Sequence, residues 1–276
     1  MSGGFDKCLL KEFSQIREHH TKIYLDNYGH LLTWKPNEFI LDIGCGSGDI
    51  THKLIYPLLP EDFQQLVCSD ISGDLLEVAE IQFKGIPKVS FDILDICSEL
   101  KDHWKDKFNH IFSLYCLMWV KCIKTAFRNI YSLLANDGEC FLIFVDKHDL
   151  IEVVFNLLDK PKWAKFVPNP GETYPFPYRK DRNTVETIIN SMKSAGFCDI
   201  RVHLETIYYT FKTEEEFLGF FKSLPNPMHL MTAEEHQEYL KEAVESARSK
   251  KIINEAGEDR KTGGFGNYVV VYAKKE

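Results

Sequence analysis

The stretch FILDIGCGSGDIT, residues 39 to 51, decides the fold of this chain. Its apolar run, Phe39–Ile43, predicts a buried strand that carries Asp42 near its end, and glycines follow at positions 44, 46 and 48. A helical pattern begins at Asp49. Because glycine has no Cβ atom, such a turn bends sharply and lets a ligand approach the backbone closely. The stretch therefore predicts strand, turn and helix, as a plain connection or as the floor of a nucleotide-like cofactor site.

Strand-like runs alternate with helix-length segments along most of the chain, which is typical of parallel strands joined by helical crossovers. The first five runs are short and apolar, as buried parallel strands are. The last two break this rhythm, so we expect an antiparallel pair at one end of the sheet. We predict an α/β fold with a Rossmann-like, seven-stranded, mostly parallel sheet, helices on both faces and an antiparallel last strand. The predicted strands are Phe39–Ile43, Gln65–Ser69, Val89–Leu94, His110–Tyr115, Glu139–Val145, Ile200–Thr210 and Tyr268–Ala273.

Helix boundaries are signalled at three places. A helix start is expected after Ser72, which is followed by acidic residues and by apolar residues at helical spacing. The amphipathic segment TAFRNIYSLLANDGE predicts a helix that ends at Asn136, with NDG as the turn into the next strand. A third helix is expected to end at Gly196.

Composition excludes several classes of protein. The chain has 276 residues, of which 44% are hydrophobic, and no apolar run reaches the ~18 residues of a membrane span. The start, MSGGFDKCLLKEFSQ, lacks the features of a signal peptide, so we expect a cytoplasmic protein. The 8 cysteines are scattered singly without metal-site spacing, so no metal is expected. A net charge of −8 disfavours a nucleic-acid partner.

The details of the glycine turn separate the possible cofactors. A dinucleotide fingerprint is GxGxxG, but here the third glycine comes one residue early and Asp49 follows it. Asp42 and Asp49 would repel a pyrophosphate and suit a cationic cofactor without phosphate. Asp70 ends the next strand, where an acid holds ribose hydroxyls. S-adenosylmethionine, which has an amino group, a sulfonium and a ribose, fits this pattern of charge.

These motifs together resemble those of the class I S-adenosylmethionine-dependent methyltransferases, over about residues 36 to 275. LDIGCGSG resembles the family's first motif, and Asp70 matches its ribose acid. FDILDI resembles the motif of the third strand, which implies that Asp95 binds the adenine amino group and that Ile96 packs nearby. The run LLANDGE stands where the family usually has a Lys-Pro-Gly-Gly turn.

A narrower resemblance, carried by VCSDIS, FSLYCLMWV and AFRNIYSLL, is to the arthropod juvenile hormone acid methyltransferases. These enzymes methylate the carboxylate of farnesoic or juvenile hormone acid, held by a Gln on the first helix and a Trp after the fourth strand. Trp119 matches the Trp, although a packing role is the alternative. Arg17 stands at the Gln position and Gln15 lies two residues earlier, so either side chain is a candidate. Met118 stands where the subfamily has His.

The resemblance therefore implies a site with S-adenosylmethionine as cofactor, S-adenosylhomocysteine as product and a hydrophobic carboxylic acid as substrate. A carboxylate is already ionised at neutral pH and needs no general base, so alignment and exclusion of water would supply the catalysis. The predicted catalytic residues are Gln15, Arg17 and Trp119. The predicted cofactor contacts are Asp42, Gly44, Cys45, Gly46, Gly48, Asp70, Ile71, Asp95, Ile96 and Ser113. The predicted apolar substrate walls are Tyr115, Phe166, Phe176, Tyr178, Phe220 and Met228, for which simple capping of the sheet is the alternative.

We expect one methyltransferase domain, residues 1–276, with a helical cap over residues 1–35 and substrate-covering insertions over 148–182 and 212–262, in a monomer or homodimer. Two alternatives stay open. One is a methyltransferase that acts on another small acid or on an amine. The other is a methyltransferase-like protein that binds the cofactor without turnover. A nucleic-acid methyltransferase is disfavoured, because SLYCLMW stands where amino-methylating ones carry an Asn/Asp-Pro-Pro-aromatic run.

Overall fold

A seven-stranded sheet forms the centre of the molecule. The computed structural model describes residues 7–254 and 263–276, with side chains described from residue 16 onward. The strand order is β3-β2-β1-β4-β5-β7-β6; only β7 runs antiparallel to its neighbours β5 and β6, and this confirms the predicted fold class. The strands are β1 Phe39–Ile43, β2 Gln65–Asp70, β3 Val89–Ile93, β4 Phe108–Leu114, β5 Leu134–His148, β6 Cys198–Tyr209 and β7 Gly264–Lys274.

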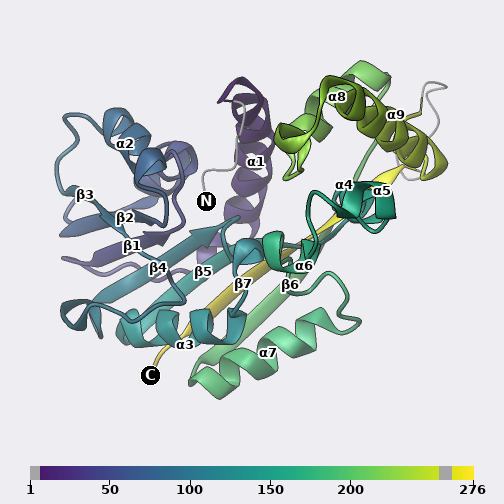
Figure 1. The fold of residues 1–276 in the computed structure, drawn as a ribbon. Helices are drawn as coiled ribbons and strands as arrows, with labels where there is room; N and C mark the ends of the chain where they lie inside the picture. The colour runs from purple at the N-terminus through teal and green to yellow at the C-terminus, as the bar shows by residue number, and fades with distance from the viewer. Residues whose placement is uncertain (1–6, 255–262) are drawn as a thin grey trace.

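Helices cover the sheet and extend it at one end (Figure 1). α3 and α7 lie together along one face, while α1 stands over the opposite side, with α2 beside the β3 edge. α4, α5, α8 and α9 gather into a helical group beyond the β6–β7 end, and α8 packs against α1. The helices are α1 Lys7–Tyr28, α2 Gly73–Gln82, α3 Ile123–Leu133, α4 Asp149–Leu158, α5 Pro161–Ala164, α6 Pro170–Thr173, α7 Thr184–Ala195, α8 Glu214–Ser223 and α9 Ala233–Ser249.

Two of the three predicted helix boundaries are confirmed. Ser72 caps α2 by accepting a hydrogen bond from the main-chain N–H of Leu75, and Gly196 ends α7 in the left-handed conformation with φ of 109°. The predicted end at Asn136 is wrong, because α3 ends at Leu133 and β5 begins at Leu134. Leu134 is fully buried and pairs with Phe108 of β4. The strand therefore begins at Leu134 and includes the polar NDG segment, where the pairing with β4 shifts register.

The helix after the glycine turn departs from α-helical geometry. Thr51–Ile55 form a π-helical turn in which the N–H of Tyr56 donates to the carbonyl oxygen of Thr51, and a 3-10 turn, Tyr56–Leu58, follows. Pro57 lies inside this segment, has no N–H to donate and displaces the preceding turn. π-Helical turns occur often at functional sites.

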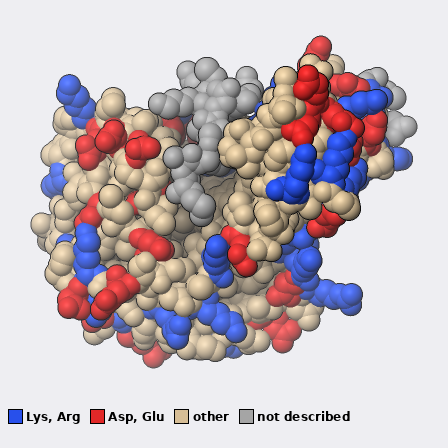
Figure 2. All heavy atoms as spheres, viewed as in Figure 1, with Lys and Arg blue, Asp and Glu red and all other residues tan. Residues whose placement is uncertain are grey.

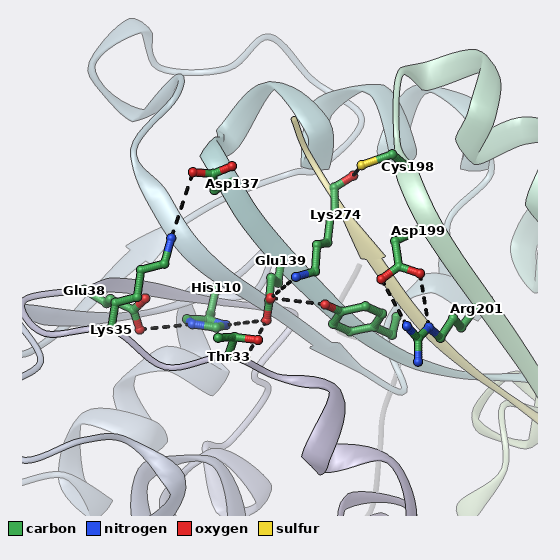
Figure 3. Close-up of polar contacts among 11 residues, drawn as sticks. Thr33, Lys35, Glu38, His110, Asp137, Glu139, Cys198, Asp199, Arg201 and Lys274 are labelled. Atoms are coloured by element: carbon green, nitrogen blue, oxygen red, sulfur yellow. Dashed lines mark hydrogen bonds and ion pairs between the residues drawn. The ribbon is translucent and has the colours of Figure 1, made fainter.

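Glu38, His110 and Glu139 form a buried polar cluster around β4 and β5 (Figure 3). Glu139 of β5 is 3% exposed and accepts hydrogen bonds from the Thr33 N–H at 2.8 Å and the Lys274 ammonium at 2.9 Å. His110 of β4 lies with Nε2 3.0 Å from a Glu38 oxygen and Nδ1 3.9 Å from Glu139. Buried carboxylates need such partners, so this cluster joins β4, β5 and β7 to the segment before β1.

Candidate functional site

The glycine turn lies at the carboxyl end of β1, between β2 and β4. The chain leaves β1 toward β2 and β3 and returns to β4 on the other side, so this is the point where the strand order reverses. In open α/β sheets ligands bind at this point, outside the carboxyl ends of the strands. The main-chain N–H groups of Gly44 and Cys45 donate to the Ser69 carbonyl oxygen at 2.7 and 2.9 Å, which fixes the turn against β2.

The three glycines of the turn have different roles. Their φ angles are 74°, 58° and 80°, so each adopts a backbone conformation that L side chains rarely take. A Cβ atom at Gly44 would clash with the side chain of Cys116, and one at Gly48 would lie 3.0 Å from the Cβ of Ala79. A Cβ at Gly46 would meet no atom within 4 Å. Gly44 and Gly48 are therefore glycines because packed neighbours leave no room for a side chain, whereas Gly46 borders open space that a ligand can fill.

Asp70 links this turn to the end of β2. Its carboxylate accepts hydrogen bonds from the N–H groups of Gly46 and Ser72, both at 2.9 Å, and the residue is 9% exposed. The neighbouring Ile71 is 68% exposed, an unusual position for a large apolar side chain beside a buried strand. An acid next to an exposed apolar surface suits a ribose and the flat base joined to it.

Asp42 lies beneath the turn and is 2% exposed. Its Oδ2 accepts a hydrogen bond of 2.5 Å from the Thr51 hydroxyl. Burial raises the pKa of Asp42 to about 7; the Thr51 hydrogen bond opposes this shift and the nearby Asp70 carboxylate adds to it. Asp42 is therefore poised to change charge near neutral pH when a cation binds beside it.

Asp49, which follows the third glycine, is held by its neighbours. It accepts hydrogen bonds from the Ser47 hydroxyl at 2.5 Å and from the Gln82 amide at 3.1 Å. The Gln82 amide also donates to the Ser47 carbonyl oxygen at 2.8 Å, so α2 holds the outer side of the turn. Gln82 is a residue that sequence reasoning missed.

The remaining predicted cofactor residues lie at the ends of β1, β3 and β4. Asp95 is exposed and accepts hydrogen bonds from the N–H of Cys97 and the hydroxyl of Ser98, both at 2.9 Å. Ile96 is buried beside it and Cys45 is half-buried. Ser113 is fully buried, and its hydroxyl donates to the Ile43 carbonyl oxygen at 2.9 Å, so it joins β4 to β1.

On the acceptor side, Tyr115 and Arg17 meet across the gap between β4 and α1. Tyr115 has φ of 61°, and its hydroxyl lies 3.4 Å from the Arg17 carbonyl oxygen and 3.3 Å from the Thr21 hydroxyl. Burial lowers the pKa of Arg17, while the nearby Tyr115 and Asp49 act in the opposite direction. Arg17 is thus directed inward, near the glycine turn. The backbone of Gln15 belongs to α1, and its side chain lies outside the described residues.

Trp119 ends the 3-10 turn Leu117–Trp119 that follows β4 and is 38% exposed. Its ring meets the ring of Phe176 edge to face, with 4.9 Å between centroids. Within the described part of the chain, the indole N–H makes no hydrogen bond. Cys116 directly precedes this turn and packs against Gly44, so the loop that follows β4 contacts the glycine turn.

The other predicted substrate walls lie at several places. Phe176 and Tyr178 are buried, and Tyr178 stacks on Phe144 of β5 with 5.8 Å between centroids. Phe166 stacks on Trp163 near α9, and Phe220 of α8 contacts Phe211. The structure thus brings Phe176 to Trp119. Met228 lies in the 3-10 turn Met228–Leu230.

A group of aromatic side chains under α1 was only partly foreseen from sequence. His20, Tyr268 and His148 follow one another in edge-to-face contact, with centroid distances of 5.6 and 6.1 Å, and Tyr115 touches Tyr268 at 6.3 Å. Burial lowers the pKa of His20 to about 4 and of His148 to about 3, so both are neutral at pH 7. His148 is the last residue of β5, and this position at the end of a strand is its one signal in the sequence.

On the face shown in Figure 2, acidic and basic side chains alternate over the α8–α9 end.

Among the described residues no group of His, Cys, Asp and Glu has the arrangement of a metal site. No described helix is long and apolar enough to cross a membrane.

Known proteins are similar to this chain in sequence and in fold. Residues 41–140 match a family model described as a methyltransferase domain. Residues 41–140 thus form a methyltransferase domain. It is 28% identical to the juvenile hormone acid O-methyltransferase of Drosophila melanogaster, over 97% of this chain and 91% of that protein. It is 25% identical to the enzyme of the same name from Bombyx mori, over 97% and 96%. The resemblance inferred from sequence is therefore confirmed.

Among solved structures, this methyltransferase domain is similar to a phosphoethanolamine N-methyltransferase of Haemonchus contortus, solved with phosphomonomethylethanolamine and S-adenosylhomocysteine. The TM-score is 0.54 and the identity 18%, over 92% of this chain and 53% of that one. At this level of identity the likeness concerns the fold alone.

Proposed function

We propose that this protein is an S-adenosylmethionine-dependent O-methyltransferase that forms the methyl ester of a hydrophobic carboxylic acid of the farnesoic or juvenile hormone acid type. The observation that carries the proposal is the position of Trp119. Trp119 lies five residues beyond the carboxyl end of β4, its ring contacts Phe176, and Cys116 of the same loop packs against Gly44. A donor in apolar surroundings suits a carboxylate oxygen, and the similarity to two juvenile hormone acid O-methyltransferases supports the same acceptor.

The residues of the turn fit the proposed cofactor. Gly46 would border it, Asp70 would accept hydrogen bonds from ribose hydroxyls, and Asp95 would accept one from the adenine amino group. When bound, the cofactor supplies an electrophilic methyl group on a sulfonium. Asp42 would stand beneath the cationic end of this group, where its carboxylate becomes favourable once a positive charge is near.

The reaction balances without a general base. A carboxylate oxygen forms a bond to the methyl carbon as the carbon–sulfur bond breaks, and the electron pair of that bond stays on sulfur. The negative carboxylate and the positive sulfonium become a neutral ester and a neutral thioether. Charge is lost in the transition state, so an apolar, water-poor site accelerates the step. Trp119 and Arg17 would orient the carboxylate, and Phe176 would exclude water.

The neutral histidines favour an acid over an amine as acceptor. An ammonium group must lose a proton before it attacks, and a base with a pKa of about 4 or about 3 accepts such a proton poorly. His20 and His148 are therefore poorly suited to activate an amine. We further propose that the enzyme is cytoplasmic and that residues 148–182 and 212–254 cover the acid; the rest of the predicted second insertion, 255–262, lies outside the described residues.

The test is incubation with radiolabelled S-adenosylmethionine and a panel of acids, amines and phenols. The expected product is a base-labile methyl ester of long, apolar acids, and removal of the carboxyl group from the same carbon skeleton serves as control. Label on an amine would favour another acceptor. Tight binding of S-adenosylhomocysteine without any product would indicate a binding protein without turnover.

A further inference from the structure

The turn after β3, residues 95–98, carries the acid that the proposed function assigns to the adenine amino group. The turn closes on itself, because the Ser98 N–H donates to the Asp95 carbonyl oxygen at 2.9 Å. The Cys97 N–H donates to one oxygen of the Asp95 carboxylate and the Ser98 hydroxyl donates to the other, both at 2.9 Å. A carboxylate has about four acceptor sites, so sites remain for a ligand. These local bonds fix the Asp95 side chain relative to its own backbone, but not relative to the sheet.

β3 is an edge strand, so the sheet supports this turn from one side only. The strand order begins with β3, which pairs with β2. Every residue of β3 is at least partly exposed, and Ile93 at its end is 60% exposed. The Leu94 N–H donates to the Asp70 carbonyl oxygen at 3.1 Å, directly before the turn. A segment with so few buried contacts is easily displaced, so the turn needs a further anchor if Asp95 is to face a ligand in one orientation.

The helix α3 supplies this anchor through the side-chain amide of Asn129. The Asn129 Nδ2 donates to the carbonyl oxygens of Ile96 and Ser98 at 2.8 and 3.0 Å. An amide NH₂ group has two donors, and here both act on the same turn. Ile96 is also buried, but an apolar contact has no preferred direction, whereas two hydrogen bonds to one planar amide fix the orientation of the turn.

α3 itself is held firmly by the core. Four of its residues are fully buried: Ala126, Phe127, Ile130 and Leu133. A weaker contact joins the same turn to the residue before α3, since the Cys97 thiol donates to the Cys122 carbonyl oxygen at 3.5 Å. Asn129 therefore connects the exposed turn to a helix whose position is set by packing.

We propose, on the basis of the proposed function, that Asn129 is a positioning residue for adenine recognition. It holds the turn so that the Asp95 carboxylate faces the 6-amino group of the base, although Asn129 itself does not touch the base. A carboxylate offers only acceptors, so it attracts an amino group and repels an oxo group at the same position. Selectivity for adenine over a 6-oxopurine then depends on Asn129, because a turn that is free to shift can move Asp95 away from either group.

The test compares the affinities of S-adenosylhomocysteine and S-inosylhomocysteine, in which an oxo group replaces the 6-amino group, by calorimetry. The unaltered protein should prefer the adenine form by at least about tenfold, the usual effect of a hydrogen bond to a charged group. Asn129→Leu keeps the size of the side chain and removes both donors, so the preference should fall to about threefold or less. Asn190→Leu makes the same change on the exposed side of α7, and as the matched control it should keep the preference.

A purely structural role for Asn129 would lower both affinities alike, so an unchanged ratio in Asn129→Leu would overturn the proposal. Asn129→Ala serves if the leucine variant does not fold. The measurement needs no acid and no turnover, which separates this inference from the proposed function. A protein that forms no ester but loses its adenine preference in Asn129→Leu supports the inference and rejects the reaction. Ester formation with a ratio that no variant alters supports the reaction and rejects the inference, and failure of the unaltered protein to bind either nucleoside rejects both.

Discussion

The Tyr115 hydroxyl lies 3.4 Å from the main-chain carbonyl oxygen of Arg17 and donates to it, which joins the end of β4 to the first helix. The same hydroxyl accepts a hydrogen bond from Thr21, one turn further along α1. α1 is thereby held over the carboxyl end of the sheet, with the backbone of Arg17 against Tyr115. The position of the N-terminal helix is thus set by a residue of β4's end.

Tyr115→Phe should weaken this connection. The change removes both hydrogen bonds but keeps the ring against Tyr268, so a loss of about 1 kcal/mol in stability is expected. Because α1 also carries Arg17, kcat for acids should fall several-fold while the affinity for S-adenosylhomocysteine stays. Steady-state kinetics and calorimetry measure the two effects. If affinity for S-adenosylhomocysteine fell as much as kcat, Tyr115 would act on the cofactor as well as on the acid, and the prediction would be wrong.

Asp70→Asn should reduce binding of S-adenosylhomocysteine by at least about tenfold, since a charged acceptor of hydroxyl hydrogen bonds is replaced by a weaker, neutral one. Calorimetry measures the affinity directly. Asp74→Asn, on the exposed first turn of α2, removes the same charge nearby and is the control. Equal affinities for the two variants would reject the role of Asp70 in the cofactor site.

Gly44→Ala and Gly46→Ala should fail in different ways. The first introduces a Cβ into the Cys116 side chain and should destabilise the fold by about 2–4 kcal/mol. The second meets no atom and carries only backbone strain, about 1 kcal/mol, but should lose cofactor affinity. Urea unfolding and calorimetry on both variants test this. Normal affinity in Gly46→Ala would show that the open space beside it is not the cofactor site.

The stability of the ligand-free protein should depend on Asp42 and pH. Its pKa is about 7 in the folded chain and is lower in the unfolded chain, so between about pH 4 and pH 7 the folded state binds more protons. Asp42 therefore reduces stability as the pH rises through this range, by up to about 4 kcal/mol. Asp42→Asn should flatten the profile between about pH 4 and pH 7, measured by urea unfolding. An unchanged slope would indicate that Asp42 ionises normally.

Trp119→Phe should retain the packing against Phe176 and remove the N–H donor. We expect kcat/KM for acids to fall by at least about tenfold, with a melting temperature close to that of the unaltered protein. Trp104→Phe changes a buried tryptophan that packs on Phe108, the first residue of β4, and is the control. Full activity of Trp119→Phe would assign Trp119 to packing alone.

Local patterns along the chain predicted the sheet and the cofactor side of the site. Asp70 ends β2, and Gly46 and Asp95 lie within three residues of the ends of β1 and β3, so once the strands are recognised their common edge follows from parallel topology. The helix end at Asn136 was missed because burial of Leu134 outweighs the turn propensity of NDG. The buried cluster around Glu139 was not predicted, because its partners Thr33 and Lys274 lie far from Glu139 in the sequence.

The sequence by itself determined the fold class, the reversal point of the sheet and the acids beside the glycine turn, because these depend on strand patterns and on residues adjacent to strand ends. Tertiary structure alone decided which glycine borders open space, that Tyr115 contacts the backbone of Arg17 and that Phe176 lies against Trp119. Each of these depends on which distant side chains occupy the space around a residue, and such packing is set only when helices and loops close over the sheet.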